Sequence, residues 1–403
     1  MNIIIFTENN RAGGMDTFYT NLIKSWPNNK DKFIFICNKS HPGLSYLNKI
    51  FPDNLKIVGH SIILNWNVSW VEKIKVKIIQ KIFRKLLLYG LLPYQFISIK
   101  KLLKNHEAGA LISINGGYPA GQTTRLANIA WSSLNKGKSI YSLHGLSLWN
   151  GGNKLKIMFE KFMTKKLISS VDNLVCVSSS CANSLDKHPG YKKNKTKVIP
   201  NGISLEDEVN NLNLRDMLNL DEKVKILLML AVYDPNKGHS YVFESMKIVL
   251  KTHPDCHLII CGDHMGDEKI LVENKLKSII EKRDNIHLLD YIPNASKLIE
   301  QADILLIATQ ETEAFGLTAL EAMKYKKPIV STEIDALRDT IGPDGIAGYC
   351  CDKNNHALYA KKIIYLLDNP DVKIQMGING NKRLKEKFSA KLMSNNYQSL
   401  LEK

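Results

Sequence analysis

The chain has 403 residues, of which 44% are hydrophobic and 23% charged, and it contains 13 prolines and seven cysteines. This composition is typical of a folded globular protein and excludes a disordered or collagen-like chain. One hydrophobic core rarely serves more than about 250 to 300 residues, so we expect two domains. The cysteines are odd in number and lack paired Cys-x-x-Cys motifs, which favours reduced thiols and argues against a disulfide scaffold or a structural zinc site.

The net charge of +16 is concentrated in the first half of the chain. Residues 1–200 contain 29 Lys+Arg and 9 Asp+Glu, a difference of +20, whereas residues 201–403 contain 26 and 30, a difference of −4. The two halves therefore differ in the partners that they favour.

The basic stretch 73–104 contains no acidic residue and interleaves its cations with large apolar side chains. Its cations are Lys73, Lys75, Lys77, Lys81, Arg84, Lys85, Lys100, Lys101 and Lys104. Helices of this composition commonly lie in the interface of an anionic membrane, but a core helix with a solvated lysine face would show the same pattern. Nucleic-acid binding is the least favoured interpretation, because no stacking aromatic residues, zinc-finger motif or RNA-recognition signature accompany the charge.

Neither a signal peptide nor a membrane-spanning helix is expected. The N-terminal residues MNIIIFTENNRAGG lack a basic segment followed by an apolar segment and a cleavage site, and they indicate a buried strand before a glycine loop. The uncharged run 86–99 is interrupted by Gly90 and Pro93 and is shorter than the roughly 20 residues that span a bilayer.

Short apolar runs alternate with amphipathic helical patterns along the whole chain. The predicted strands are 3–6, 33–37, 110–114, 139–142, 173–177, 225–231, 257–261, 286–289, 304–307 and 328–331. Their continuous apolarity indicates burial on both faces, and such strands separated by helices predict an α/β protein with two doubly wound, Rossmann-like parallel sheets. Ligands bind beyond the carboxyl ends of the strands in sheets of this kind.

A turn marks the boundary between the two domains. Pro200-Asn201-Gly202 ends a strand and is followed by a polar, acidic stretch over 204–222. We predict an N-terminal domain over 1–203, a C-terminal domain over 204–381 and a C-terminal helix over 382–403.

The segment 308–323, ATQETEAFGLTALEAM, follows a predicted strand and therefore begins at the carboxyl edge of the second sheet. A helix is predicted from about Gly316 to Lys327, before Pro328 stops it. The unpaired amides and the positive dipole end at the start of this helix suit a diphosphate. Lys237 and Gly238 end another strand and would bring a cation to the same place.

These motifs together resemble the retaining GT-B glycosyltransferases of the group 1, or family 4, type. The resemblance is carried by Glu313 and Glu321 with Phe315-Gly316 between them, the Lys237-Gly238 loop, the linker 200–203 and the Gly13-Gly14 loop after the first strand. It is strongest from Ile199 to about Tyr365. A glutamate pair at this spacing is weak by itself, whereas the placed set of motifs is specific.

The resemblance implies a nucleotide-sugar donor of the UDP or GDP type, bound mainly by the C-terminal domain as a substrate, with no other cofactor. Glu321 would bind the ribose hydroxyls and Glu313 the transferred sugar. The diphosphate would be held by the residues of two loops: Lys237, Gly238, Ala314, Phe315, Gly316 and Leu317. The base would lie against the loop that contains Asp290, Tyr291 and Ile292. Val232 stands where the family usually carries an arginine, so one phosphate contact is missing or supplied elsewhere.

In the N-terminal domain the resemblance implies further contacts. Gly13 and Gly14 would let the backbone approach the donor phosphates, and His144 matches the active-site histidine of the family. The acceptor would lie near the glycine-rich strand end formed by Asn115, Gly116, Gly117 and Tyr118. The C-terminal helix would pack back on this domain, as is usual in the family.

Each motif also has a purely structural interpretation. Glu313 and Glu321 could belong to a solvated surface, His144 could be a structural histidine, and Gly13-Gly14 could be only a tight turn. We favour function for the glutamates because of the flanking strand and Phe-Gly pair.

No metal is predicted, because the chain contains no Asp-x-Asp motif. Lys237, the amides and the helix dipole would stabilise the leaving diphosphate instead, with Glu313, His144 and Lys237 as the catalytic residues of a hexosyl transfer with retention.

The basic first half favours a glycan acceptor, or one carried on a polyprenyl diphosphate, in the synthesis of a bacterial surface polysaccharide such as O-antigen (lipopolysaccharide) or capsule. The protein would be cytoplasmic and peripheral at the inner face of the cell membrane. A soluble acceptor, a nucleotide-sugar 2-epimerase or phosphorylase of the same fold, and a non-catalytic membrane-surface binding module remain alternatives. A dinucleotide oxidoreductase is disfavoured, because Gly-x-Gly-x-x-Gly is absent.

Overall fold

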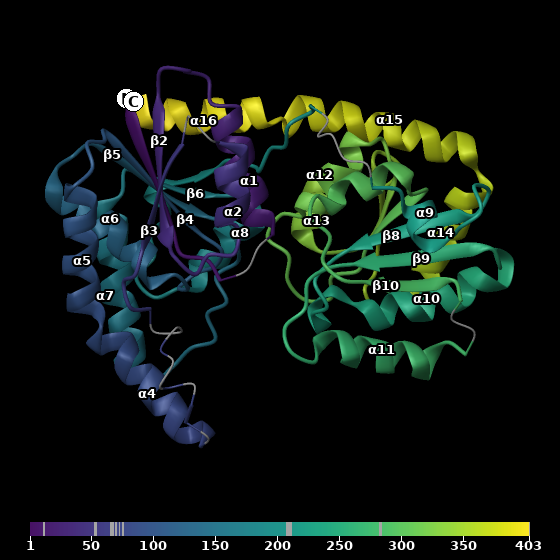
Figure 1. Ribbon diagram of the computed structural model, residues 1–403, viewed down its shortest axis with the longest axis horizontal. Coiled ribbons are helices and arrows are strands. Elements are labelled where there is room, and N and C mark those ends of the chain that lie inside the picture. The colour runs from purple at the N-terminus through teal and green to yellow at the C-terminus, as the bar shows by residue number, and fades with distance from the viewer. Residues whose placement is uncertain are drawn as a thin grey trace. The chain divides into compact units, whose positions relative to one another are not determined.

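The computed structural model describes residues 1–10, 13–51, 55–64, 68, 71, 73–74, 76–206, 212–281 and 284–402. Lys75 of the basic stretch and Lys403 of the predicted C-terminal helix lie outside the described residues. The chain forms two compact units (Figure 1). The first unit contains Met1–Pro200 and Met393–Lys403, and the second contains Asn201–Leu392.

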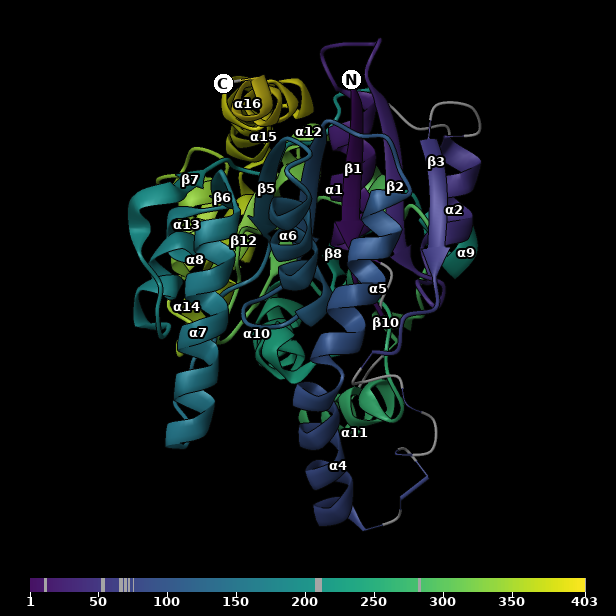
Figure 2. The same cartoon turned by 90° about the vertical axis from the view of Figure 1, so that its left-hand side faces the viewer.

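The first unit is built on a seven-stranded parallel sheet with the order β3-β2-β1-β4-β5-β6-β7 (Figure 2). Its strands are β1 (Asn2–Thr7), β2 (Lys32–Asn38), β3 (Leu55–His60), β4 (Ala110–Asn115), β5 (Lys138–Leu143), β6 (Asn173–Cys176) and β7 (Thr196–Val198). In the middle of the sheet, Ile4 of β1 is paired with Ile34 of β2 on one side and with Leu111 of β4 on the other.

Helices cover both faces of this sheet. The helices of the first unit are α1 (Gly14–Lys24), α2 (Leu44–Ile50), α4 (Lys77–Gly90), α5 (Leu92–Lys104), α6 (Gln122–Leu134), α7 (Lys154–Ser170), α8 (Ser179–Ser184) and α16 (Ala390–Glu402). Alternate residues of β1 feed two cores: Ile3 and Ile5 join one cluster with α1 and α16, and Ile4 and Phe6 join another with α5 and α6. This division explains why β1 is apolar at every position.

The last helix of the chain belongs to the first unit. Met393, Tyr397 and Leu401 of α16 are spaced by four residues, so they share one helix face, and all three are buried in the cluster that contains Ile3. The Ser394 hydroxyl donates to the carbonyl of Leu22 at 3.0 Å. The helix begins at Ala390 rather than near residue 382.

The second unit contains a six-stranded parallel sheet with the order β10-β9-β8-β11-β12-β13. Its strands are β8 (Lys225–Leu230), β9 (Cys256–Cys261), β10 (Ile286–Leu289), β11 (Ile304–Ile307), β12 (Ile329–Thr332) and β13 (Gly348–Cys351). Its helices are α9 (Leu214–Leu218), α10 (His239–Thr252), α11 (Glu268–Ile279), α12 (Leu317–Lys324), α13 (Asp335–Ile341), α14 (His356–Asp368) and α15 (Pro370–Lys387).

The predicted fold class is confirmed, and each of the ten predicted strands is present. Strands β3 and β13 were not predicted, and of β7 only the end before Pro200 was predicted. All three lie at an edge of a sheet, as does β10, which was predicted. An edge strand is covered less completely than a central one, and β3 and β7 accordingly mix exposed and buried residues. Continuous apolarity is therefore a weaker signal for edge strands than for central ones.

No single helix among the described residues is long and apolar enough to cross a membrane. Helices α4 and α5 reach the required length and composition together, but they are bent by 48° where they meet.

The buried histidines predict how stability depends on pH. Burial lowers the pKa of His60, His188 and His239 to about 4 from the usual 6.5. The unfolded chain therefore binds protons that the folded chain does not as the pH falls from 6.5 towards 4, and the free energy of unfolding should decrease over this range. The pKa shift of one such histidine lowers the free energy of unfolding by about 2 kcal/mol at a pH of about 5.

Urea unfolding across this range measures the effect. His60→Phe removes one of these histidines and should therefore reduce the pH dependence of the free energy of unfolding. Phenylalanine preserves the packing, because the His60 ring stacks on Phe6. An equal pH dependence in the parent and the variant would contradict the assignment.

Candidate active site

The candidate site of the second unit lies at the carboxyl ends of β8 and β11. These strands are neighbours in space but not in sequence, so the strand order reverses between them. In doubly wound sheets this reversal separates the two loops and opens a crevice for a ligand. The loop after β8 contains residues 231–238, and the loop after β11 contains residues 308–316.

Asn236 joins the two loops. Its carbonyl accepts a hydrogen bond from the amide of Gln310 at 2.7 Å, and its side-chain oxygen accepts from the amides of Glu311 and Thr312 at 2.8 and 3.2 Å. Its side-chain nitrogen donates to the carbonyl of Thr312 at 3.0 Å. This residue was not predicted from the sequence. The feature that could have indicated it is the position of an asparagine between a proline and Lys237 in a turn.

Gly238 brings the same loops into backbone contact. Its φ of +73° lies in the left-handed region, and a Cβ atom at this position would lie 2.0 Å from the carbonyl oxygen of Ala308. Both facts require glycine. The Lys-Gly pair is therefore explained by the approach of the two loops, which places Lys237 beside the segment that follows β11.

The structure brings Lys237 and Glu313 together. The ammonium group of Lys237 lies 3.0 Å from the Glu313 carboxylate, and the two side chains are 27% and 21% exposed. A diphosphate at this place would compete with Glu313 for the lysine. The arrangement can therefore bind an anion and release a carboxylate in the same step.

The start of α12 lies at the same place. Gly316, with a φ of +89°, precedes the helix, and the amides of Phe315, Gly316, Leu317 and Thr318 have no acceptor within the described ranges. Such amides and the positive helix end favour an anion. The amide of Ala314, which was predicted to face the ligand, donates to the carboxylate of Glu313 at 3.2 Å.

A small cavity of about 30 Å³ lies between these groups. It is lined by Lys237, Glu313, Gly316 and Thr318 and by the ends of β8 and β11. Lys237 and Glu313 both line this cavity, so a phosphate group that contacts the lysine there would compete with the Glu313 carboxylate.

The remaining predicted donor residues lie along the same edge of the sheet. Glu321 is half-buried in α12. Tyr291 and Ile292 follow β10, which is two strands from β8 or roughly 10 Å, and Tyr291 is exposed. Before them, Asp290 accepts a hydrogen bond from Lys269 at 2.6 Å, which lowers the pKa of that carboxyl.

The candidate residues of the first unit lie at the carboxyl ends of β1, β4 and β5. The His144 amide donates to the carbonyl of Asn115 at 2.8 Å, and the Tyr118 amide donates to the carbonyl of Leu146 at 3.3 Å. A Cβ atom on Gly145 would lie 1.6 Å from the carbonyl oxygen of Gly116. The histidine loop and the predicted acceptor loop are therefore packed backbone against backbone.

Side chains from both ends of the chain hold His144. Its Nε2 atom lies 2.8 Å from the Ser142 hydroxyl, which lies 2.6 Å from the hydroxyl of Tyr397 in α16. Its ring lies 4.0 Å from that of Phe18 in α1, centroid to centroid. Phe18 and Tyr397 carry no sequence signal for this role, because only the fold brings them to the histidine.

The four predicted acceptor residues divide into two kinds. Asn115 and Tyr118 are buried: Asn115 donates to the Tyr141 hydroxyl at 2.7 Å, and the Tyr118 hydroxyl lies 2.8 Å from that of Thr164. Gly116 is exposed and Gly117 is partly exposed. The buried pair supports the loop, and the glycines present its backbone to solvent.

Gly13 is the N-cap of α1 and Gly14 is its first residue, and both glycines are exposed. The amide of Gly13 donates to the Asp16 carboxylate at 3.0 Å, and that carboxylate also lies 3.2 Å from Nε2 of His41. A phosphate group at Gly13 would therefore replace a carboxylate that already caps the helix.

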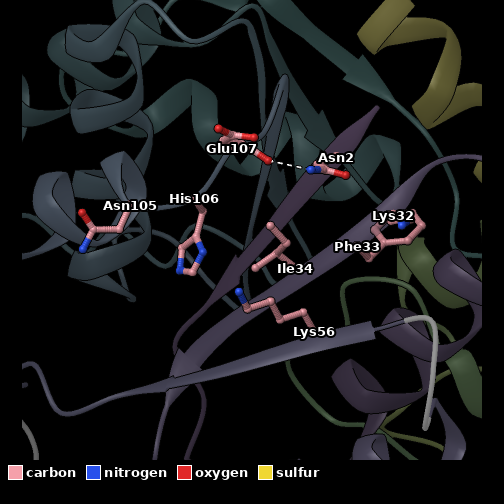
Figure 3. A pocket seen from close by; sticks show the side chains of 8 residues that line it. All are labelled: Asn2, Lys32, Phe33, Ile34, Lys56, Asn105, His106 and Glu107. Carbon is pink, nitrogen blue, oxygen red and sulfur yellow. Dashed lines mark hydrogen bonds between the residues drawn. The ribbon is translucent and has the colours of Figure 1, made fainter.

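A larger pocket in the first unit lies away from these residues. Its volume is about 290 Å³, and it is lined by the starts of β1, β2 and β3 together with Asn105, His106 and Glu107 (Figure 3). Burial and the neighbouring charges of Lys56 and Lys136 lower the pKa of His106. This pocket is at the amino edge of the sheet, opposite the edge that binds ligands in such folds.

No group of three His, Cys, Asp or Glu residues that could hold a metal ion occurs in the described part of the chain.

Substitution of Asn236 tests its role in joining the loops. Asn236→Ala leaves two amides and one carbonyl without their partner, so the free energy of unfolding should fall by about 1–3 kcal/mol. Asn236→Asp keeps the oxygen that accepts from the two amides and loses only the hydrogen bond to the Thr312 carbonyl, so its free energy of unfolding should lie between those of the alanine variant and the parent. Urea unfolding measures all three, and an alanine variant as stable as the parent would exclude the role.

Comparison with known proteins identifies the family. The profile described as Glycosyltransferase Family 4 matches residues 12–207, and the profile described as Glycosyl transferases group 1 matches residues 210–383. An uncharacterised glycosyltransferase of Methanocaldococcus jannaschii is 25% identical over 255 residues, which are 62% of this chain and 64% of that protein. The chain thus spans slightly less than two thirds of this relative.

Two further proteins are similar over more of the chain. The capsular polysaccharide biosynthesis glycosyltransferase CapM of Staphylococcus aureus is 23% identical over 317 residues, which are 76% of this chain and 81% of CapM. The structure of Anabaena HepE in complex with UDP and glucose has the same fold, with a TM-score of 0.76 at 13% identity over 100% of this chain and 99% of that one. Since the two family profiles together cover most of its length, the chain belongs to the group 1 glycosyltransferases with the GT-B fold.

Proposed function

We propose that this glycosyltransferase moves a hexosyl group from a UDP- or GDP-sugar to a glycan or polyprenyl-diphosphate-linked acceptor, with retention of configuration at the anomeric carbon. The observation that carries the proposal is the meeting of Lys237, Glu313 and the start of α12 at the strand reversal of the second unit. The complex of Anabaena HepE with UDP and glucose, a protein of the same fold, supports a nucleotide-sugar donor.

The arrangement suggests how the leaving group is stabilised. The donor diphosphate takes the place of the Glu313 carboxylate on Lys237 and accepts hydrogen bonds from the amides of 315–318. Charge that develops on the leaving phosphate then meets a fixed cation and oriented dipoles, which is electrostatic preorganisation. No divalent metal has a role in this proposal, because the lysine and the amides supply the positive potential.

The displaced Glu313 then has a second task. Once it leaves Lys237, its carboxylate can accept hydrogen bonds from the hydroxyl groups of the transferred sugar. The acceptor hydroxyl enters on the face from which the diphosphate departs and gives its proton to a phosphate oxygen. His144, held by Ser142 and Phe18, orients the sugar in this scheme.

The charge of the first half of the chain supports the acceptor part of the proposal. Its excess of 20 cations suits an acceptor anchored by a diphosphate to an anionic membrane. The similarity to CapM, whose name assigns it to capsular polysaccharide biosynthesis, favours the same kind of pathway here. We place the protein in the cytoplasm, at the inner face of the cell membrane.

A panel of nucleotides tests the donor site. UDP, GDP, ADP and NAD are added in turn to the protein in EDTA, and the thermal midpoint is measured. A ligand at about 100 times its dissociation constant stabilises the folded state by about 2.7 kcal/mol, so one of UDP and GDP should raise the midpoint. If neither does, the donor site is excluded and the membrane-binding module without catalysis becomes the better hypothesis.

Substitution of Lys237 tests the chemistry. Lys237→Ala should lower turnover by about 10²–10³-fold, the usual cost of one transition-state contact, while stability changes little because the ion pair is partly exposed. Lys223→Ala, which removes an exposed lysine elsewhere in the same unit, is the matched control and should leave turnover unchanged. Unchanged turnover in Lys237→Ala would remove this residue from the site. Formation of sugar 1-phosphate from a glycan and inorganic phosphate would favour the phosphorylase, and formation of an epimerised donor without transfer would favour the epimerase.

A further inference from the structure

Two helices of the first unit carry large apolar side chains that the unit does not cover. In α4 no described residue is buried, and Ile78, Ile82 and Leu86 are between 52% and 71% exposed. In α7, Leu155, Met158 and Phe162 are between 58% and 75% exposed. Both sets have helical spacing, so each forms a stripe along one face of its helix.

The charges around both stripes are positive. The cations of these helices are Lys77, Lys81, Arg84 and Lys85 in α4 and Lys154, Lys156, Lys161, Lys165 and Lys166 in α7. Glu160 is the one acidic residue in either helix. It is 4% exposed and accepts a hydrogen bond from Arg125 at 2.7 Å, so it does not offset these cations at the surface.

The two helices lie at the same edge of the sheet. Helix α5 leads back to the start of β4, so α4, which precedes it, projects beyond the carboxyl edge, and α7 begins after the loop that leaves β5 at that edge. The rings of Tyr89 in α4 and Phe159 in α7 are in contact, with centroids 4.7 Å apart. Figure 2 shows α4 and the first turns of α7 extending from this edge.

We propose that residues 77–90 and 154–162 form one docking surface, the α4–α7 surface, for an anionic phospholipid bilayer. The proposal rests on the proposed function for its purpose, which is access to a lipid-linked acceptor, and it adds α7 as a contact outside the basic stretch 73–104. Lysines are depleted at the centres of protein interfaces, whereas apolar stripes flanked by lysines suit the boundary between head groups and acyl chains.

The surface lies on the membrane and does not cross it. Gln95, Ile99 and Leu103 of α5 are buried, and the latter two belong to the core that contains Ile4 and Phe6 of β1. A span made of α4 and α5 would have to remove these side chains from that core. Helix α5 therefore stays in the fold, and only α4 and the start of α7 enter the interface.

Vesicle sedimentation with the full chain tests the proposal. Vesicles contain phosphatidylcholine alone or with about 30% phosphatidylglycerol. The parent should bind the anionic vesicles at least about tenfold more strongly, and this binding should weaken as salt is raised. Leu155→Ser/Met158→Ser/Phe162→Ser and Ile78→Ser/Ile82→Ser/Leu86→Ser should each reduce binding by about tenfold or more.

A matched control separates the stripes from exposed apolar residues in general. Ile270→Ser/Leu271→Ser/Ile374→Ser changes three apolar side chains of the second unit that are 53% to 60% exposed, and it should bind like the parent. Circular dichroism and the nucleotide-induced thermal shift verify that each variant is folded. An α7 variant that binds anionic vesicles like the parent overturns the inclusion of α7.

Other outcomes separate this proposal from the proposed function. Equal binding to neutral and anionic vesicles, or self-association of the parent without vesicle binding that either triple variant abolishes, overturns the lipid surface. Binding to anionic vesicles by a parent that no nucleoside diphosphate stabilises supports the surface and counts against the proposed donor. Loss of vesicle binding by the stripe variants with the nucleotide shift retained supports both.

Discussion

Close approach of backbone to backbone at the carboxyl ends of the strands is the constraint on which both candidate sites depend. In the second unit it is the contact of Gly238 with the carbonyl of Ala308, and in the first unit that of Gly145 with the carbonyl of Gly116. Any side chain at either glycine would overlap with a carbonyl oxygen and push the loops apart. Gly238 and Gly145 thus have a structural role: by allowing the close approach of the loops, they determine where Lys237 and His144 lie.

The ion pair between Lys237 and Glu313 is formed in the structure but is weak enough for an anionic ligand to open it. Because both side chains are partly exposed, the pair is worth no more than about 1 kcal/mol. A diphosphate carries more charge than a carboxylate and also reaches the amides that begin α12, so it can displace Glu313 at small cost. Under the proposed function, the carboxylate therefore becomes available for the sugar only when the donor is present.

Much of this arrangement could be predicted from the sequence, and the exceptions have physical causes. Central strands and the loops that leave them were predicted because continuous apolar runs and turn residues are local signals. The edge strands β3 and β13 were missed, because an edge strand is covered less than a central one. The helix after Phe315 was predicted to reach Lys327 but ends at Lys324, where Lys326 adopts a left-handed conformation with a φ of +54°. Asn236 was missed because its hydrogen bonds join two loops about 75 residues apart in sequence, and such contacts produce no periodic pattern in the sequence.

The C-terminal helix shows the same limit of local signals. Tyr397 reaches Ser142 across 255 positions of sequence, and Ser142 contacts His144. The hydroxyl of Tyr397 is fully buried, and burial raises its pKa well above the ordinary value for tyrosine, so it stays neutral and serves only as a hydrogen-bonding group. Since α16 also supplies Met393 and Leu401 to the core beneath β1, the same helix that completes the first unit fixes the partner of its histidine. The packing of α16 and the support of His144 therefore depend on each other, because the side chains that stabilise α16 and the side chain that reaches Ser142 lie on one face of the helix.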